Sequence, residues 1–246
     1  NLYSLVLKAN QAYHDDDMPI MTDAEYDSAF HILKAKMLEA GQGEPDFVGA
    51  KSSKGFKKVK HTSRRLSLDN AFSVSDMSDF TGRCALSGAD SFIAEPKIDG
   101  LSITLTYING HFIRGVTRGD GLEGEDVTVN VAELIGVPQI IAYKGNMEAT
   151  GEAYMSKQHF LELNTLLASR GEKLKANPRN AAAGTIRQHD IEAVRERNLS
   201  FFAYHVVFED CDIFQTDAEN MDFLQTQGFI VPPFEVVLQL DVWHQI

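Results

Sequence analysis

Asn109 and Gly110 form the sequence feature that most restricts the fold, because they separate two runs with the composition of β-strands. Residues 101–107 alternate between apolar and polar side chains, and residues 111–117 form the second run. An Asn-Gly pair readily adopts the two positive φ angles of a tight hairpin turn, which makes it a strong hairpin signal. We therefore expect strands over 101–108 and 111–117, joined into a hairpin.

Helices and further strands are predicted on both sides of this hairpin. Thr22-Asp-Ala-Glu25 has the form of a capping box, and apolar residues follow it at helical spacing, so residues 1–40 predict two helices. The rest of the chain predicts a short helix from about Ser75, helices over 126–134 and 156–169, a helix capped by Thr216, and strands over 91–96, over 199–208 and from Phe229. This order predicts the α+β class, a small helical N-terminal piece followed by a mixed, mainly antiparallel domain.

The composition is that of a globular protein without a membrane span. The chain has 246 residues, enough for one small and one large domain, and no apolar run approaches the length needed to cross a bilayer. The N-terminus lacks a signal pattern, and Cys84 and Cys211 form no Cys/His cluster. These features fit a reducing cytoplasm and predict neither a zinc site nor a membrane partner.

Charge is distributed unevenly along the chain. The net charge of −12 argues against a general binder of polyanions. Residues 51–65 nevertheless contain seven Lys and Arg and no acid, whereas residues 198–246 contain eight acids and neither Lys nor Arg. We interpret the basic run as a linker, which is either a solvated, mobile loop or a surface that meets nucleic-acid phosphates. The acidic region is not expected to touch nucleic acid.

Lys97 lies where one predicted strand turns into the next, within Glu95-Pro-Lys-Ile-Asp-Gly100, and is the only lysine between Lys60 and Lys144. An amine held at the end of a strand can point into a cleft and act as a nucleophile on phosphorus. Asp99 can then orient the amine or contact the sugar of a nucleotide. The same residues also fit an ordinary charged turn, since Asp-Gly is a common turn signal.

Further motifs accompany the Lys97 motif in a set order. They are Tyr13-His14, Thr22 to Asp27, Leu66-Ser-Leu-Asp-Asn70, Arg118-Gly-Asp-Gly121, Gly124-Glu-Asp126, Gly151-Glu152 and the run from Asn177 to Gln188. This order resembles the NAD-dependent DNA ligases of bacteria and of some viruses and phages, over nearly the whole chain. The resemblance implies a nicotinamide mononucleotide-recognition subdomain over 1–50, a basic linker over 51–65, and an adenylation domain over 66–246 with an ATP-grasp-like nucleotidyltransferase fold.

An activity follows from the resemblance. In such enzymes the lysine at the position of Lys97 attacks the α-phosphate of NAD, forms lysyl-AMP and releases nicotinamide mononucleotide, with Mg²⁺ as the usual helper. This is the first step in sealing nicks between a 5′-phosphate and a 3′-hydroxyl in duplex DNA, in replication and repair. We expect a monomer that acts on NAD and nicked DNA in the cytoplasm of a bacterium, or in a host cell if a virus or phage encodes it.

The resemblance also implies binding roles. Five residues match those that hold nicotinamide mononucleotide: Tyr13, His14, Asp23, Tyr26 and Asp27. The adenylate half is matched by Glu152 at the ribose hydroxyls, Glu95 beside adenine, Tyr204 stacked on adenine, Ser67 and Leu68 flanking it, Asp99 at the sugar or amine, Arg118 near ribose and phosphates, and Arg179 and Arg187 near phosphate or the nicked strand. Taken alone, Tyr204 would be plain core and Arg187 a surface ion pair.

The chain departs from the family pattern in two places. The family often carries an arginine two residues before the motif glutamate, where this chain has Thr150. The chain also has no lysine after Lys175, so two later motif lysines are absent. We therefore expect a piece of a longer protein that cannot seal nicks by itself.

Two other functions stay open from the sequence. One is a nucleotidyltransferase that uses ATP or GTP, against which residues 13–27 argue. The other is a non-catalytic NAD-binding homologue, against which the retention of Lys97, Asp99, Arg118 and Glu152 argues.

Overall fold

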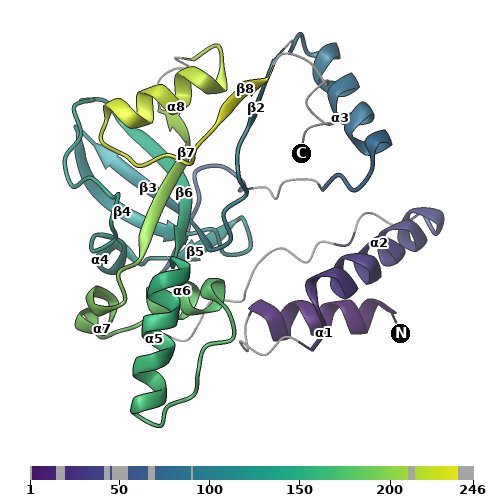
Figure 1. Cartoon of the computed structure of the whole chain (residues 1–246). Coiled ribbons are helices and arrows are strands. Elements are labelled where there is room, and N and C mark those ends of the chain that lie inside the picture. Colours follow the sequence, from purple (N-terminus) through teal and green to yellow (C-terminus); the bar gives the residue numbers. More distant parts are fainter. Residues whose placement is uncertain are drawn as a thin grey trace.

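A four-stranded antiparallel sheet forms the centre of the computed structural model (Figure 1). The structure describes residues 2–14, 20–41, 45, 55–65, 70–89, 91–209 and 214–237. The strand order is β4-β3-β6-β7, with the bounds β3 (Leu101–Ile108), β4 (His111–Thr117), β6 (Met147–Tyr154) and β7 (Ser200–Phe208). The fold belongs to the α+β class, as the sequence predicts.

The β3–β4 hairpin confirms the prediction made from the Asn-Gly pair. Asn109 and Gly110 both adopt positive φ angles, 52° and 82°. The backbone N–H of Ile141 donates to the Gly110 carbonyl at 2.8 Å, so the turn is also tied to the chain that follows β4. The hairpin thereby fixes one edge of the sheet.

The two faces of the sheet differ in burial. Along β6, Met147, Ala149, Gly151 and Ala153 are buried, while the residues that alternate with them are partly exposed. The buried face joins the core with apolar side chains from β3 and β7 and from four helices: α4 (Thr128–Val131), α5 (Lys157–Ser169), α6 (Pro178–Ile186) and α8 (Asp217–Thr226). We call the other face the open face; on β3 and β6 it carries Ser102, Thr104, Glu148, Thr150 and Glu152.

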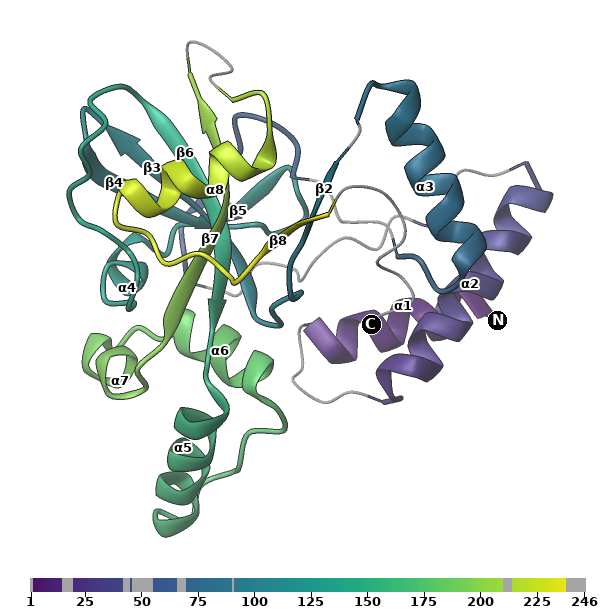
Figure 2. The same cartoon turned by 45° about the horizontal axis from the view of Figure 1, so that its top comes forward.

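The two predicted N-terminal helices are present as α1 (Leu2–His14) and α2 (Asp23–Glu39). The predicted capping box from Thr22 to Glu25 begins α2, and Leu33 is buried. Both views show this helical hairpin to one side of the sheet, on the same side as α3 (Val74–Leu86) (Figures 1 and 2). His31 of α2 meets the ring of Phe72 edge-on, with 4.7 Å between the ring centroids.

Part of the predicted basic linker is a strand. β1 (Lys58–Lys60) pairs with β5 (Glu123–Glu125), and an ion pair joins Lys58 to Glu123. Because these cations face acids across the strand pair, the interpretation as a solvated loop is wrong for residues 58–60. Residues 51–54 lie outside the described ranges, and the predicted domain limits stay predictions.

Two other predicted elements differ from the observed ones. The helix predicted over 126–134 is shorter in the structure and is confined to α4. The chain after it turns toward β7, where the backbone of Ile135 exchanges hydrogen bonds with Leu199 and Phe201. The strand predicted from Phe229 begins only at β8 (Glu235–Val237), which pairs with β2 (Phe92–Ala94). Pro232 and Pro233 precede β8 and have no amide hydrogen to give to a strand. The sequence did not predict β6, α6 or α7 (Ile191–Glu196).

Across the described ranges, no helix combines the length and apolarity that a bilayer crossing requires.

The packing of β3 leads to a prediction about stability. Leu105 is fully buried in the core, so replacing it with Ala should lower the free energy of unfolding by roughly 2–5 kcal/mol. Leu161 on α5 is 66% exposed, and Leu161→Ala should change the free energy by no more than about 0.5 kcal/mol. Urea denaturation of both variants measures the difference, and equal losses would contradict the assigned core.

Candidate active site

Glu152 lies on the open face near the end of β6, and several charged groups converge on it. Burial raises the pKa of Glu152 to about 7, because removing water from a carboxylate disfavours its charged form. The positive charges of Lys97, Arg179 and Arg118 oppose that rise, as does a hydrogen bond from the Gly100 backbone N–H. We call Lys97, Arg118, Glu152 and Arg179 the Glu152 cluster.

The loop that carries Lys97 is fastened to β6 at Gly100. A Cβ atom on Gly100 would lie 2.2 Å from the Ala153 carbonyl oxygen, so only glycine allows this approach. Nε of Arg179, at the start of α6, donates to the Gly100 carbonyl at 3.1 Å and lies 3.2 Å from Oδ1 of Asp99. The Lys97 side chain itself is exposed. The backbone of the loop is therefore held against β6 and α6 at Gly100, while the Lys97 amine is exposed to solvent.

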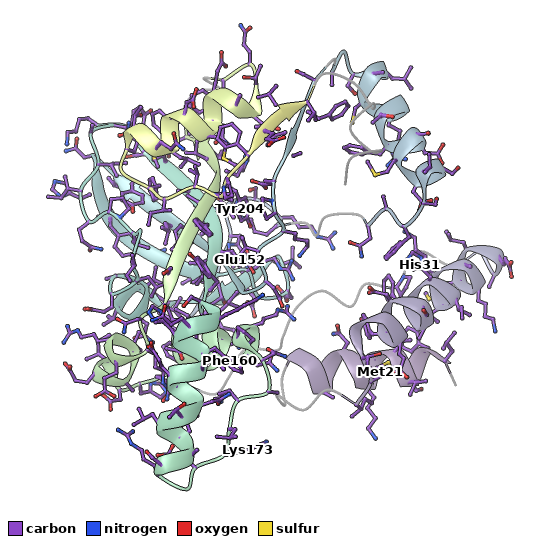
Figure 3. All side chains as sticks on the ribbon, viewed as in Figure 1. Met21, His31, Glu152, Phe160, Lys173 and Tyr204 are labelled. Atoms are coloured by element: carbon purple, nitrogen blue, oxygen red, sulfur yellow. The ribbon has the colours of Figure 1, made fainter. Side chains whose placement is uncertain are left out.

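Tyr204 reaches the open face through an irregularity in β7. The pairing of β6 with β7 shifts register between Thr150 and Gly151, and Tyr204 is the residue of β7 left without a partner. Such a bulge re-aims a side chain without breaking the sheet. The Tyr204 hydroxyl lies 3.2 Å from Oγ of Ser102, and Figure 3 shows Tyr204 close to Glu152. The prediction of an aromatic ring at this site is thus compatible with its position.

The pKa values of Tyr204 and Glu95 are both raised. Burial raises the pKa of Tyr204, and the negative charges of Glu152 and Glu95 raise it as well. Loss of solvent also raises the pKa of Glu95, and the Asp217 carboxylate at the start of α8 adds to this shift. Glu95 therefore lies within electrostatic reach of Tyr204.

The loop after β4 holds Arg118 beside the sheet. The Arg118 backbone N–H donates to the Ser102 carbonyl at 3.0 Å, and the Asp120 side chain accepts from two backbone N–H groups of the loop at 2.9 Å. Nε2 of His61 lies 3.1 Å and 3.0 Å from the carbonyls of Thr117 and Arg118. Ser102 and His61 were missed from the sequence, because neither belongs to a motif and only the fold brings them to the site.

Arg187 lies outside the Glu152 cluster. Its Nε donates to Oε2 of Glu125 at 2.7 Å, and the Glu125 side chain is only 2% exposed. Of the two roles considered from the sequence, the ion pair is the one observed, although its partner is buried. A contact of Arg187 with phosphate or DNA stays a prediction.

The residues predicted to hold nicotinamide mononucleotide lie on the helical hairpin, apart from the sheet in both views (Figures 1 and 2). The Tyr26 hydroxyl donates to Oδ1 of Asn10 at 3.2 Å, and burial raises the pKa of Tyr26. Asp27 is partly buried beside it. The side chains of Tyr13, His14 and Asp23, and both Ser67 and Leu68, fall outside what the structure describes.

The described residues contain no group of three or more His, Cys, Asp or Glu side chains that could hold a metal ion. Chemically, the site combines one exposed amine, two guanidinium groups, one dehydrated carboxyl group and one ring. This set suits a ligand with anionic phosphate, sugar hydroxyls and a flat base.

The position of Glu152 leads to a prediction about pH. Its folded-state pKa of about 7 lies above the ordinary value of 4.5, so its contribution to stability is complete below pH 4.5 and is lost as pH rises to 7. Glu152→Gln cannot ionise, so it should be more stable than wild type at pH 8 by on the order of 2 kcal/mol and should match it near pH 4.5. Thermal unfolding at both pH values checks this, and a pH-independent difference would contradict it.

Comparison with known proteins places the chain in a family. Residues 53–240 match the family model of the NAD-dependent DNA ligase adenylation domain. The chain is 41% identical to a DNA ligase of Gluconobacter oxydans, over 93% of this chain and 36% of that protein, and 42% identical to one of Metamycoplasma arthritidis, over 94% and 36%. It spans about a third of the length of these curated relatives.

Among solved structures, the ATP-dependent DNA ligase from bacteriophage T7 in complex with ATP matches 66% of this chain and 54% of its own, with 18% identity and a TM-score of 0.35. That similarity is too low to carry a conclusion. The match to the family model covers most of the chain, so the chain belongs to the NAD-dependent DNA ligase adenylation domain family.

Proposed function

We propose that Lys97 is the nucleophile that takes AMP from NAD. Its Nζ forms a bond to the α-phosphorus, the bond from that phosphorus to the bridging oxygen breaks, nicotinamide mononucleotide leaves with the oxygen, and the amine releases a proton. The observation that carries this proposal is the Glu152 cluster, in which the charges of two guanidinium groups and an exposed amine act on one partly buried carboxyl group. Arginine side chains in such a place can hold phosphate oxygens in pairs.

The remaining residues are assigned to the parts of the nucleotide. Glu152 binds the ribose hydroxyls, Tyr204 stacks on adenine, and Glu95 lies beside the base. The charges of Glu152 and Glu95 both act on Tyr204, which supports the assignment, because the three side chains then lie near one another. Arg118 and Arg179 stabilise negative charge on the phosphate as the bond to Lys97 forms.

Mg²⁺ would supply further neutralisation of the phosphates. Since the described part of the chain offers no cluster of three acidic or imidazole ligands, the ion would be held mainly by phosphate oxygens and water, which is usual for Mg²⁺. The α1–α2 hairpin would bind the nicotinamide half, where an aromatic ring such as Tyr26 suits a pyridinium cation.

For the whole protein we propose the sealing of nicks in duplex DNA, in replication and repair. Lysyl-AMP would pass its adenylate to a 5′-phosphate, and a 3′-hydroxyl would then displace AMP. The names of the curated relatives support this proposal. A monomer in the cytoplasm of a bacterium, or of a cell infected by a virus or phage, would carry out the reaction.

The first test is labelling of Lys97. Incubation with NAD that carries a label in its adenylate, together with Mg²⁺, should place one label per chain on the peptide with Lys97. Lys97→Arg keeps the positive charge near Glu152 but should take no label, and Lys144→Ala should label as wild type does. Label on another lysine, or on Lys97→Arg, would contradict the assignment.

The second test concerns the donor. Tyr26→Ala and Asp27→Ala should weaken NAD binding by roughly tenfold, as expected from the loss of a cation–π or ribose contact, while AMP binding stays unchanged. Tyr3→Ala, an exposed tyrosine on α1, serves as the matched control. Titration calorimetry with NAD and with AMP separates the two halves. An equal loss for both ligands would show that these residues act only on the packing of the hairpin.

A further inference from the structure

Ser102 and Tyr204 meet across a strand that lies between them. Ser102 belongs to β3 and Tyr204 to β7, and β6 separates these two strands in the sheet. Their hydroxyl oxygens are nevertheless only 3.2 Å apart. Because neighbouring strands lie about 4.8 Å apart, β3 and β7 are separated by roughly twice that distance. The long axis of the Tyr204 side chain therefore runs across β6 toward β3.

The ring of Tyr204 consequently lies along the open face instead of standing upright on it. Side chains of a strand usually project about perpendicular to the sheet. Tyr204 departs from this rule at the register shift, where it has no partner in the pairing of β6 with β7. The residue is partly exposed, so one face of the ring is left available to a ligand.

Ser102 is connected to three groups of the site. Its hydroxyl meets Tyr204, and its backbone carbonyl accepts from the Arg118 N–H at 3.0 Å. It is also the β3 residue that pairs with Glu152, which Figure 3 shows close to Tyr204. Ser102 therefore lies where the tyrosine ring, the carboxyl group and the loop of Arg118 come together.

The contact between the two hydroxyl groups is a bond between neutral groups. Burial raises the pKa of Tyr204, and the hydrogen bond with Ser102 opposes this rise without cancelling it. Tyr204 therefore keeps its proton at neutral pH. A tyrosine side chain rotates about only two bonds, and a bond at its far end restricts both rotations. The contact with Ser102 thus fixes the direction of the ring.

We propose that Ser102 is a positioning residue for the nucleotide, and that it holds the Tyr204 ring flat across β6 as a stacking surface for the base. A base binds more tightly to a ring that is already in place, because ordering the ring during binding costs free energy. This proposal rests on the adenylation activity proposed above, in which Tyr204 stacks on adenine.

A role of Ser102 in stability alone explains the arrangement less well. Backbone hydrogen bonds already join β6 to β3 and to β7 along their lengths. One further bond between two partly exposed hydroxyl-bearing residues adds little to the attachment of these strands. Its specific effect is on the direction of one ring.

The test is a double-mutant cycle with Ser102→Ala, Tyr204→Phe and the double variant. Each single change removes one of the two hydroxyl groups and keeps the ring. Thr106→Val, which removes a hydroxyl group from the same face of β3 opposite Glu148, is the matched control. Titration calorimetry measures AMP binding, labelling of Lys97 is followed over a range of NAD concentrations, and the melting temperature of each protein is recorded.

Ser102→Ala should raise the Kd for AMP and the KM for NAD about fivefold, as expected for the loss of one neutral hydrogen bond, and keep the maximal rate of labelling within about twofold. Tyr204→Phe should give the same changes, because it removes the same bond. The double variant should then also be weakened only about fivefold. Thr106→Val should bind as wild type does, and all melting temperatures should stay within about 4 °C of wild type.

Two outcomes would overturn the proposal. One is a Kd for AMP in Ser102→Ala equal to that in Thr106→Val. The other is a double variant weakened by the product of the two single effects, since the two hydroxyl groups would then act independently. If the wild type binds AMP but takes no label from NAD, the proposed adenylation fails, and the cycle measured with AMP still decides the role of Ser102. A wild type that does not bind AMP would refute both.

Discussion

The backbone hydrogen bonds that hold β6 between β3 and β7 are the constraint on which the rest of the structure depends. They set Glu152 opposite Ser102 on one side and Phe202 on the other. A slip of one residue would turn Glu152 into the core and Ala153 to the open face. Because Ala153 is fully buried, such a slip is excluded, and the carboxyl group has one position to which the surrounding loops adjust.

The acids around the site are paired with cations from distant segments. Arg187 ties the end of α6 to Glu125 of β5, Lys58 ties β1 to Glu123, and Arg65 pairs with Glu148. A chain with a net charge of −12 thus balances several of its acids by ion pairs with cations that are distant in the sequence. The same ion pairs also hold β1, β5 and α6 in place. These contacts therefore both neutralise the acids and fix the elements around the site.

The sequence predicted the parts of the fold that have local signals. Asn109 and Gly110 predicted the hairpin, and Ser156 and Thr216 predicted the starts of α5 and α8, where each accepts a capping hydrogen bond. No local signal indicates β6, because Gly151 and the charged residues on its open face interrupt the apolar pattern of a strand. α6 does have a standard helix start at Asn177 and Pro178, but the same run also matches a binding motif, and only the motif is assigned from the sequence.

The members of the Glu152 cluster all belong to motifs of the sequence. Lys97, Arg118, Glu152 and Arg179 were all named from the sequence, and the structure brings them together. The contacts of Ser102 and Arg65 could not be predicted, since Ser102 meets Tyr204 through the register of the strands and Arg65 meets Glu148 from a segment that is distant in the sequence. The irregularity that frees Tyr204 likewise belongs to the pairing of two strands and not to either strand alone.

The close contact at Gly100 changes how the motif Glu95-Pro-Lys-Ile-Asp-Gly100 should be interpreted. The role proposed for Lys97 is chemical, whereas that of Gly100 is steric, since the Gly100 backbone lies against the Ala153 carbonyl. A side chain at position 100 would push the loop away from β6. Because Lys97 is three residues from Gly100, its amine would then be displaced as well. Inactivity after substitution of this glycine would therefore measure a mechanical displacement, and would carry no information on whether residue 100 touches the nucleotide.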